Sequence, residues 1–425
     1  QNQASFLTAI FCVMLGKNLI ISAMAATNLR FNFPNSTSPV PFEIKVDSDL
    51  VQLAKDRAAT YRVSHGLYSE WSNEGAPAES MASLAKHWTD SYDWSAVEER
   101  INSKYNHFAT TVPGNRDYAD PIPLHFIHHK SANDSAVPLL FLHGWTSTHL
   151  EWVKLIEPLT DSFHIIAPDL PGYGFSPAPT KPGLGPREMG IAFDAMMKQL
   201  GYEKYGLVTN DLGAMVGEWM VTDVQTSIIG HFCDFLLSNP TPADLERFAK
   251  NETTAEENEY LAVMNEWSNN HFAYSTIHAQ KPLALSHSFA DSPVGFAGWI
   301  WDLKHVASDG YAYSLDDIIT DSFLLWIQEP YTSIRAYLEV FKPENWAFSK
   351  TDVPTGVTQW GNINGPFPEL AKYPLAPRDW CERMATVVFF KRYEYGGHFP
   401  ALSQTALYAS DVKEFYGSLQ KKTDA

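Results

Sequence analysis

Continuous apolar runs of strand length alternate with helical spacing through the middle and the end of the chain. The apolar runs fall at residues 124–129, 137–142, 163–167, 206–208, 353–359 and 386–390. Fully apolar strands separated by helical segments are typical of an α/β protein with a mostly parallel, doubly wound sheet covered on both faces. The sequence therefore predicts one α/β core built from these strands.

The pattern of apolar residues is different in two parts of the chain, one before the predicted core and one inserted into it. Residues 30–75 are rich in Pro, Ser and Asn around one helical stretch at 48–63, and a second helical stretch runs from 78 to 102. After Asn239-Pro240 about 100 residues of helical, aromatic-rich sequence separate the first four strands from the last two. A helical insertion into the α/β core accounts for this order.

An apolar segment opens the chain and is interrupted by Lys17. A membrane-spanning helix needs about 20 mostly apolar residues, and Lys17 falls where its centre would lie. Residues 1–28 are therefore predicted to be an apolar leader, an anchor-like helix or a helix packed on the body of the protein. Residues 4–26 could contact a membrane surface, so the sequence leaves a membrane-associated location, of the endoplasmic reticulum type, and a soluble intracellular one both open.

Composition excludes several classes of protein. With 425 residues, 45% of them hydrophobic, the chain can bury a large core, so it is not a disordered protein. A net charge of −18 would repel nucleic acid. The three cysteines, Cys12, Cys233 and Cys381, form neither a disulfide framework nor a CxxC zinc motif. We expect no cofactor.

Histidines at 125, 128 and 129 invite the question of a metal site. On a strand, His125 and His129 share one face and His128 points to the other, so the three cannot converge on one ion. We interpret them as surface histidines of a strand and expect no metal.

A strand-to-helix corner carries the first chemical signal. The apolar strand at 206–208 runs into Asp211, and Gly213 follows two residues later at the start of a helical stretch. This is the pattern of a nucleophile elbow with Asp in the place of Ser, and no G-x-S-x-G occurs in the chain. Alternatively, Asp211 only caps the helix that follows.

Two further elements support the catalytic interpretation. His143 and Gly144 shape the loop directly after the strand at 137–142, and the backbone N–H of Trp145 would form an oxyanion hole together with that of Leu212. His398 comes late in the chain, as the base of such an enzyme does.

These residues resemble the α/β-hydrolase-fold epoxide hydrolases, specifically the microsomal type. Further matching segments are Tyr92-Asp93-Trp94, 105–108, 171–176 and 291–295. The resemblance implies an N-terminal segment that wraps an α/β-hydrolase core and a helical cap inserted into that core. The implied division is 1–28 for the leader or anchor, 29–135 for the wrapping segment, 136–240 and 346–425 for the core, and 241–345 for the cap.

The resemblance also implies roles for particular residues. Asp211 would be the nucleophile and His398 the base, while Tyr274 and Tyr337 of the cap would activate the epoxide oxygen. Glu369 is the favoured acid that orients His398, with Asp352 and Asp379 as rivals. The departures from the family pattern are Thr146, Thr209, Asn210 and Leu212, which put the standard pocket shape in doubt.

The expected activity is that of an ether-bond hydrolase, which converts an apolar epoxide and water to a vicinal diol through an Asp ester. Trp299, Phe323 and Trp326 are the predicted pocket aromatics. The alternatives are an epoxide-opening cyclase, a haloalkane dehalogenase-like enzyme, or a catalytically silent binding protein on the same fold. The sequence leaves open whether the chain forms a homodimer.

Overall fold

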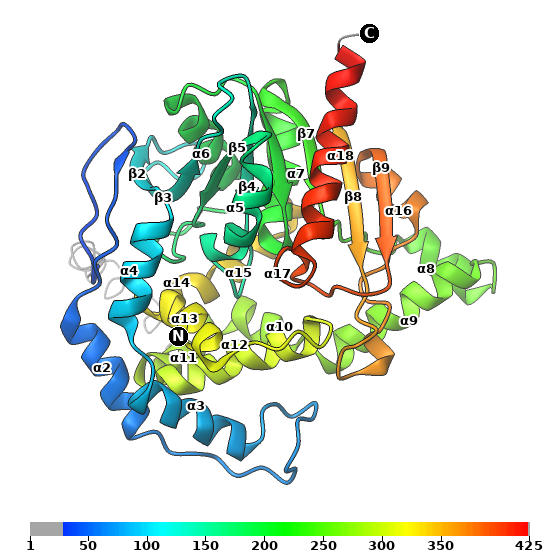
Figure 1. Ribbon diagram of the computed structural model, residues 1–425. Coiled ribbons are helices and arrows are strands. Elements are labelled where there is room, and N and C mark those ends of the chain that lie inside the picture. The colour runs from blue at the N-terminus through cyan, green and yellow to red at the C-terminus, as the bar shows by residue number, and fades with distance from the viewer. Residues whose placement is uncertain (1–28, 424–425) are drawn as a thin grey trace, which may run out of the picture.

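A single nine-stranded sheet forms the centre of the computed structural model, which describes residues 29–423 (Figure 1). Its strands are β1 (Val40–Pro41), β2 (His107–Val112), β3 (Ile122–His129), β4 (Val137–Leu142), β5 (Phe163–Pro168), β6 (Tyr205–Thr209), β7 (Ile228–Cys233), β8 (Pro354–Trp360) and β9 (Thr386–Tyr393). Their spatial order is β1-β2-β3-β5-β4-β6-β7-β8-β9.

Most of the sheet is parallel, as the sequence predicts. The pairs from β5 through β4, β6, β7 and β8 to β9 are parallel, and only the edge formed by β1, β2 and β3 pairs antiparallel. The strands β1, β2 and β7 were not predicted. Gly230 and His231 interrupt the apolar run of β7, and polar threonines interrupt that of β2.

Helices cover both faces of the sheet because successive strand residues point in opposite directions. Leu139 and Phe141 of β4 pack in a cluster with α5 (Val153–Leu159) and α18 (Thr405–Thr423). Leu140 and Leu142 belong to the other cluster, together with α6 (Pro186–Gln199) and α7 (Asp211–Asp223). Two shorter helices, α16 (Arg378–Met384) and α17 (Pro400–Ser403), lie near the end of the chain.

The N-terminal segment contains three helices, α2 (Ser48–Ala59), α3 (Ala78–Asp90) and α4 (Trp94–Lys104). The single helical stretch predicted at 78–102 is two helices, because the Asp93 side chain accepts the backbone N–H groups of Ser95 and Ala96 and starts α4 there.

Eight helices lie between β7 and β8 and form a layer beyond the carboxyl ends of the parallel strands (Figure 1). They are α8 (Pro242–Ala249), α9 (Ala255–Asn270), α10 (Ala273–Gln280), α11 (Pro282–Asp291), α12 (Pro293–Ala307), α13 (Leu315–Trp326), α14 (Pro330–Ile334) and α15 (Ala336–Val340). The short 3₁₀ helices are η2 (His149–Trp152), η3 (Gln225–Ser227), η4 (Pro343–Trp346) and η5 (Pro368–Leu370).

The N-terminal segment is fastened to this helical insertion. Trp88 and Trp94 place their rings edge-on against Phe323 of α13, at centroid distances of 6.3 and 4.8 Å. The Tyr92 hydroxyl lies 3.0 Å from that of Thr320. Burial of these aromatic rings makes the segment an integral part of the core rather than an appendage.

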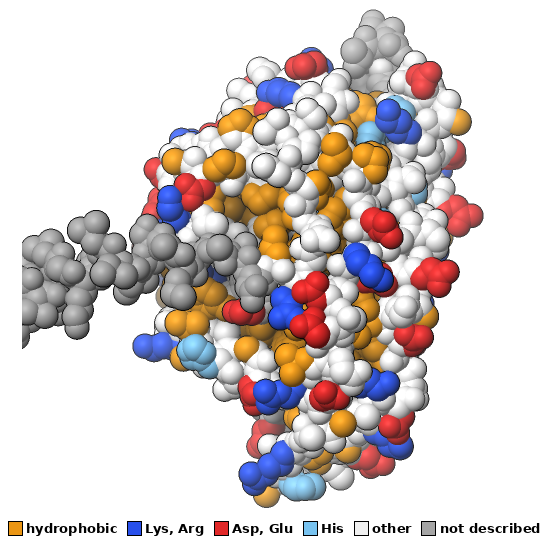
Figure 2. Space-filling view, turned by 90° about the vertical axis from the view of Figure 1, so that its left-hand side faces the viewer, with side chains coloured by type: hydrophobic (Ala, Val, Ile, Leu, Met, Phe, Trp, Pro, Cys, Tyr) orange, Lys and Arg blue, Asp and Glu red, His pale blue; other side chains and the backbone are white. Residues whose placement is uncertain are grey.

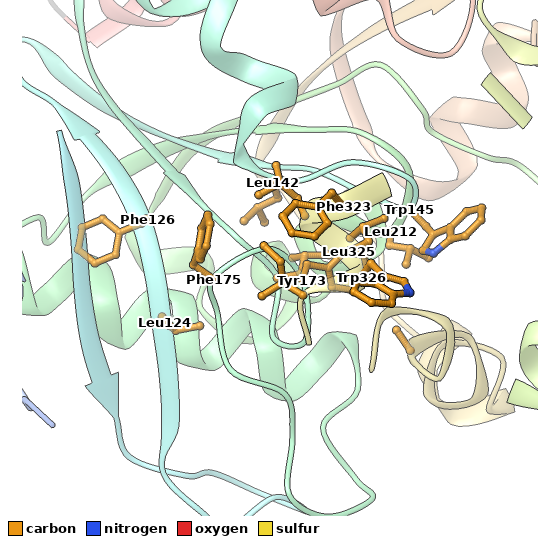
Figure 3. Close-up of a cluster of buried hydrophobic side chains, with 14 of the residues drawn as sticks. Leu124, Phe126, Leu142, Trp145, Tyr173, Phe175, Leu212, Phe323, Leu325 and Trp326 are labelled. Carbon is orange, nitrogen blue, oxygen red and sulfur yellow. The ribbon is translucent and has the colours of Figure 1, made fainter. Parts of the chain in front are cut away.

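The predicted pocket aromatics belong to the same packing. Phe323 and Trp326 lie in a buried hydrophobic cluster with Tyr173 (Figure 3). The Trp326 indole N–H donates to the Phe289 carbonyl, and that of Trp299 donates to His278 Nε2. All three aromatics stabilise the insertion, and none lines the cavity described below.

No helix of the described residues is long and apolar enough to cross a membrane. The apolar segment at 4–26 lies outside the described residues. On the face drawn in Figure 2, hydrophobic side chains gather toward the centre, and Lys, Arg, Asp and Glu side chains surround them.

Candidate active site

The corner between β6 and α7 places Asp211 in a left-handed backbone conformation. Its φ is +49°, a value that few residues other than glycine adopt but that Asp tolerates better than most. Gly213 allows the tight turn, because a Cβ there would overlap the Leu142 carbonyl. The backbone at Asp211 therefore forms the sharp strand-to-helix turn that the sequence pattern predicts.

The loop after β4 holds one oxygen of this carboxylate. The Trp145 N–H donates to Asp211 Oδ1 at 3.0 Å, and the Leu212 N–H also bonds the carboxylate. Gly144 permits this approach, because a Cβ at that position would overlap the Asp211 side chain. The His143 side chain holds the loop in place, because its Nε2 accepts a hydrogen bond from the Leu170 N–H at 3.0 Å.

His398 lies opposite the second oxygen, with 3.6 Å between its Nε2 and Asp211 Oδ2. The ring packs edge-on against Phe235 at 4.7 Å, and its backbone N–H donates to the Ala307 carbonyl at 2.7 Å. Burial raises the pKa of Asp211 to about 6. Burial, together with the charge of Lys304, lowers the pKa of His398 to about 4, so the imidazole is a neutral base at physiological pH.

Two tyrosines from the insertion face the same carboxylate. Tyr274 of α10 stacks on Trp145 at 5.8 Å, and Tyr337 of α15 meets the Trp145 ring edge-on at 6.2 Å. Burial raises the pKa of both hydroxyls, and the two side chains hydrogen-bond each other. Both groups therefore stay protonated and can donate hydrogen bonds.

A cavity of about 380 Å³ lies beside the nucleophile corner and the two tyrosines. Asp211, Tyr274 and Tyr337 line it, and most of its remaining wall is apolar and aromatic. A volume and lining of this kind suit a small, mainly apolar ligand.

Glu369 is not part of this site, contrary to the prediction. It is exposed, and its carboxylate lies beside Glu266 and His271. Asp352 and Asp379 are exposed as well. Within the described part of the chain, Asp211 is the one carboxylate within 4 Å of the His398 ring nitrogens.

The loop after β8 explains the displacement of Glu369. Five residues, 361–365, follow the strand before the segment that contains Glu369 begins. Asn362 anchors this loop by donating to the Val306 carbonyl and accepting the Asp309 N–H. The loop thereby carries Glu369 to the surface.

Sequence reasoning missed two buried carboxyl groups near the site. Burial raises the pKa of Glu151, on η2, to about 7, and burial raises that of Asp234, directly after β7, well above its usual value. The Tyr408 hydroxyl faces the Asp234 carboxyl group. The position of Asp234 at the end of a strand beside β6 is a signal that could have identified it, had β7 been predicted.

Two departures from the family pattern have structural roles. Asn210 donates from Nδ2 to Glu151 Oε1 at 2.9 Å and to the His398 carbonyl at 2.8 Å. Thr209 Oγ1 lies 2.7 Å from His231 Nε2. These polar side chains tie the elbow to the loops around it.

The prediction that the histidines of β3 lie at the surface is wrong for two of them, because His125 and His128 are buried. His125 Nδ1 and His149 Nδ1 lie 2.8 and 2.9 Å from different oxygens of Asp169. The ligand atoms of these three residues are close enough together to hold a metal ion. However, the Asp169 carboxylate already accepts the backbone N–H groups of His149 and Phe175. We therefore interpret the group as a hydrogen-bonded core cluster.

Comparison with known protein families agrees with the geometry. Residues 39–152 match the model "Epoxide hydrolase N terminus", and residues 137–230 match "alpha/beta hydrolase fold". The chain has the α/β-hydrolase fold and is similar to the epoxide hydrolases of that fold. The sheet order and the strand-to-helix corner at Asp211 are those of this fold.

Relatives of the enzyme match it over most of their length. The juvenile hormone epoxide hydrolase of Bombyx mori is 28% identical, over 91% of this chain and 88% of its own. Epoxide hydrolase 1 of Sus scrofa is 25% identical, over 90% and 89%. The crystal structure of the Bombyx mori juvenile hormone epoxide hydrolase superposes with a TM-score of 0.79 at 26% identity, covering 92% of this chain and 96% of that one.

Proposed function

We propose that the enzyme hydrolyses an apolar epoxide to a vicinal diol through an ester between the substrate and Asp211. The observation that carries the proposal is the surroundings of one carboxylate. Trp145 N–H holds Oδ1, His398 Nε2 faces Oδ2, and two hydroxyl donors line the same cavity.

In the first step, Asp211 Oδ2 attacks a ring carbon of the epoxide and the carbon–oxygen bond of the ring breaks. Tyr274 and Tyr337 donate hydrogen bonds to the departing oxygen, and one of them transfers its proton. Both groups remain protonated at neutral pH because their burial raises their pKa values.

In the second step, His398 takes a proton from water, and the hydroxide attacks the carboxyl carbon of Asp211 rather than the substrate. The oxyanion that forms on Oδ1 is stabilised by the Trp145 and Leu212 N–H groups. When this intermediate collapses, the departing alkoxide takes the proton from His398 and the diol is released. The proton that remains on the Asp211 carboxyl group returns to the tyrosinate, which restores both the carboxylate and the tyrosine. The nucleophile is Asp because an sp³ carbon provides no hydrolysable carbonyl, so the enzyme must provide one.

The helical insertion acts as a cap in this proposal. It contributes Tyr274 and Tyr337 from 241–345, and the core parts at 136–240 and 346–425 contribute Asp211 and His398. The paired tyrosines favour an epoxide over a haloalkane, because a departing halide needs no proton whereas a departing alkoxide does.

The test is a single turnover of a terminal alkyl epoxide in ¹⁸O-labelled water. Label should appear in the peptide containing Asp211, and the first diol should carry unlabelled oxygen. The variant His398→Gln should accumulate a covalent adduct of the substrate mass on that peptide. Label found only in the diol, with no adduct, would overturn the two-step scheme and favour direct attack by water.

A further inference from the structure

A second carboxyl group, Glu218, lines the cavity, although the reaction above does not use it. It lies on α7 seven residues after Asp211, which is two helical turns or about 10 Å along the axis. Ala214 and Met215 line the cavity between them. One face of α7 therefore forms a wall with the nucleophile at one end and Glu218 at the other.

One oxygen of the Glu218 carboxyl group is buried without a hydrogen-bond partner. This oxygen is Oε1, and the residue as a whole is 3% exposed. The nearest titratable group is His231, with Nδ1 3.5 Å from Oε1, too far for a good hydrogen bond. The other nitrogen of His231 is engaged with Thr209.

The protonation state of Glu218 follows from this environment. Burial raises its pKa to about 8, and burial lowers that of His231 to about 3. At neutral pH Glu218 is therefore a neutral carboxylic acid with one O–H donor. Such a group costs stability when buried unpaired, so its place in a cavity wall indicates that a ligand satisfies it.

A second unpaired polar atom belongs to another residue that lines this cavity. Ser275 of α10 is fully buried, its Oγ has no hydrogen-bond partner, and the residue lines the same cavity. Tyr274, its neighbour in sequence, is one of the proposed proton donors. The wall is thus not uniformly apolar, and both unpaired groups can donate a hydrogen bond to an oxygen of the ligand.

We propose that Glu218 is a specificity-determining residue, which donates a hydrogen bond to an oxygen acceptor on the substrate. The substrate is then an elongated apolar epoxide that carries a carbonyl or similar oxygen about two helical turns from the reacting ring. This inference rests on the proposed epoxide hydrolysis at Asp211, because that reaction fixes the other end of the substrate.

The experiment compares two matched series of terminal epoxides on the full chain. One series ends in a methyl ester, the other in an alkyl group of the same size, and both are stepped in chain length. The wild-type enzyme should favour the ester by about tenfold or more in kcat/KM, at one chain length. The variant Glu218→Leu should lose this preference, and Glu218→Gln, which keeps a donor, should retain most of it.

Met215→Leu is the matched control on the same wall, and it should not change the ratio of the two kcat/KM values. If the ratio is near one in the wild type, or if Glu218→Leu preserves it, the inference is wrong. Failure of the proposed function would differ, because neither series would then label Asp211. If the leucine variant does not fold, the ratio of the two kcat/KM values is measured in Glu218→Gln instead, and loss of the ester preference there would contradict hydrogen-bond donation as its cause.

Discussion

Asp211 presents its two carboxylate oxygens to different groups, and His398 faces only one of them. Oδ2 lies 3.6 Å from His398 Nε2, longer than a hydrogen bond, whereas Oδ1 is held by Trp145 N–H at 3.0 Å. Oδ2 is therefore the oxygen available for attack, and Oδ1 is the one placed to carry the negative charge during ester hydrolysis.

Replacing the nucleophile should abolish turnover and also stabilise the fold at high pH. The folded-state pKa of Asp211 is about 6, against about 4 in an unfolded chain, so the wild type loses about 3 kcal/mol as pH rises from about 4 to about 6. The variant Asp211→Asn avoids this loss. Urea unfolding should show it more stable than wild type at pH 8, with a smaller difference at pH 5. An equal difference at both values would contradict burial as the cause.

The rate of alkylation should have an acid limb near pH 6. Asp211 attacks only as the carboxylate, and burial raises its pKa to about 6, so the rate should fall about tenfold per pH unit well below that value. Rapid-quench measurement of adduct formation in His398→Gln isolates this step from ester hydrolysis. A limb near pH 4 instead would show that the carboxylate is better solvated than its burial implies.

The tyrosines should act on alkylation alone. Tyr274→Phe or Tyr337→Phe should slow adduct formation by about 10- to 100-fold, because each removes one of two donors to the departing oxygen. Tyr373 also lines the cavity but stacks on Trp267, so Tyr373→Phe is the matched control and should have little effect. Equal losses in all three variants would point to packing rather than proton donation.

Asn210 should matter for the second step. Its amide donates to both the His398 carbonyl and Glu151, so Asn210→Ala releases the histidine loop and removes one hydrogen bond from a buried carboxyl group. We expect ester hydrolysis to slow more than alkylation, and the free energy of unfolding to fall by about 1–3 kcal/mol. Stopped-flow burst kinetics and urea unfolding measure the two effects, and slower alkylation alone would refute this positioning role.

Glu369 should be dispensable. Its carboxylate is exposed and lies beside His271 rather than His398, so Glu369→Gln should hydrolyse the ester at the wild-type rate. Mass spectrometry during turnover should detect no more adduct than in the wild type. Accumulation of adduct, as expected for His398→Gln, would place Glu369 in the site after all.

The successes and failures of sequence reasoning have different physical origins. Asp211, Trp145 and His398 follow strand ends, where local patterns of apolar residues and glycine determine the backbone. Their mutual approach follows from the parallel sheet, because the carboxyl ends of neighbouring strands meet at one edge. These residues could therefore be found without knowledge of distant contacts.

Glu369 and the aromatic residues of the insertion could not be placed in this way. The loop after β8 places Glu369 at the surface, and no local pattern around Glu369 indicates this course of the chain. Helical spacing indicates that Trp299 and Phe323 face the protein interior, but it does not show whether they pack in a core or line a cavity. The partners of Asn210 come from distant segments, so no local pattern indicates them.

The aromatic contact between the N-terminal segment and α13 affects the order in which the protein can fold during synthesis. Trp88 and Trp94 leave the ribosome long before Phe323, their packing partner, has been synthesised. The nascent chain therefore keeps aromatic surface exposed until the insertion emerges, and a fragment that begins at β4 would leave the same surface of α13 bare. We expect such a fragment to aggregate, and we expect chaperones to engage the native chain during that interval.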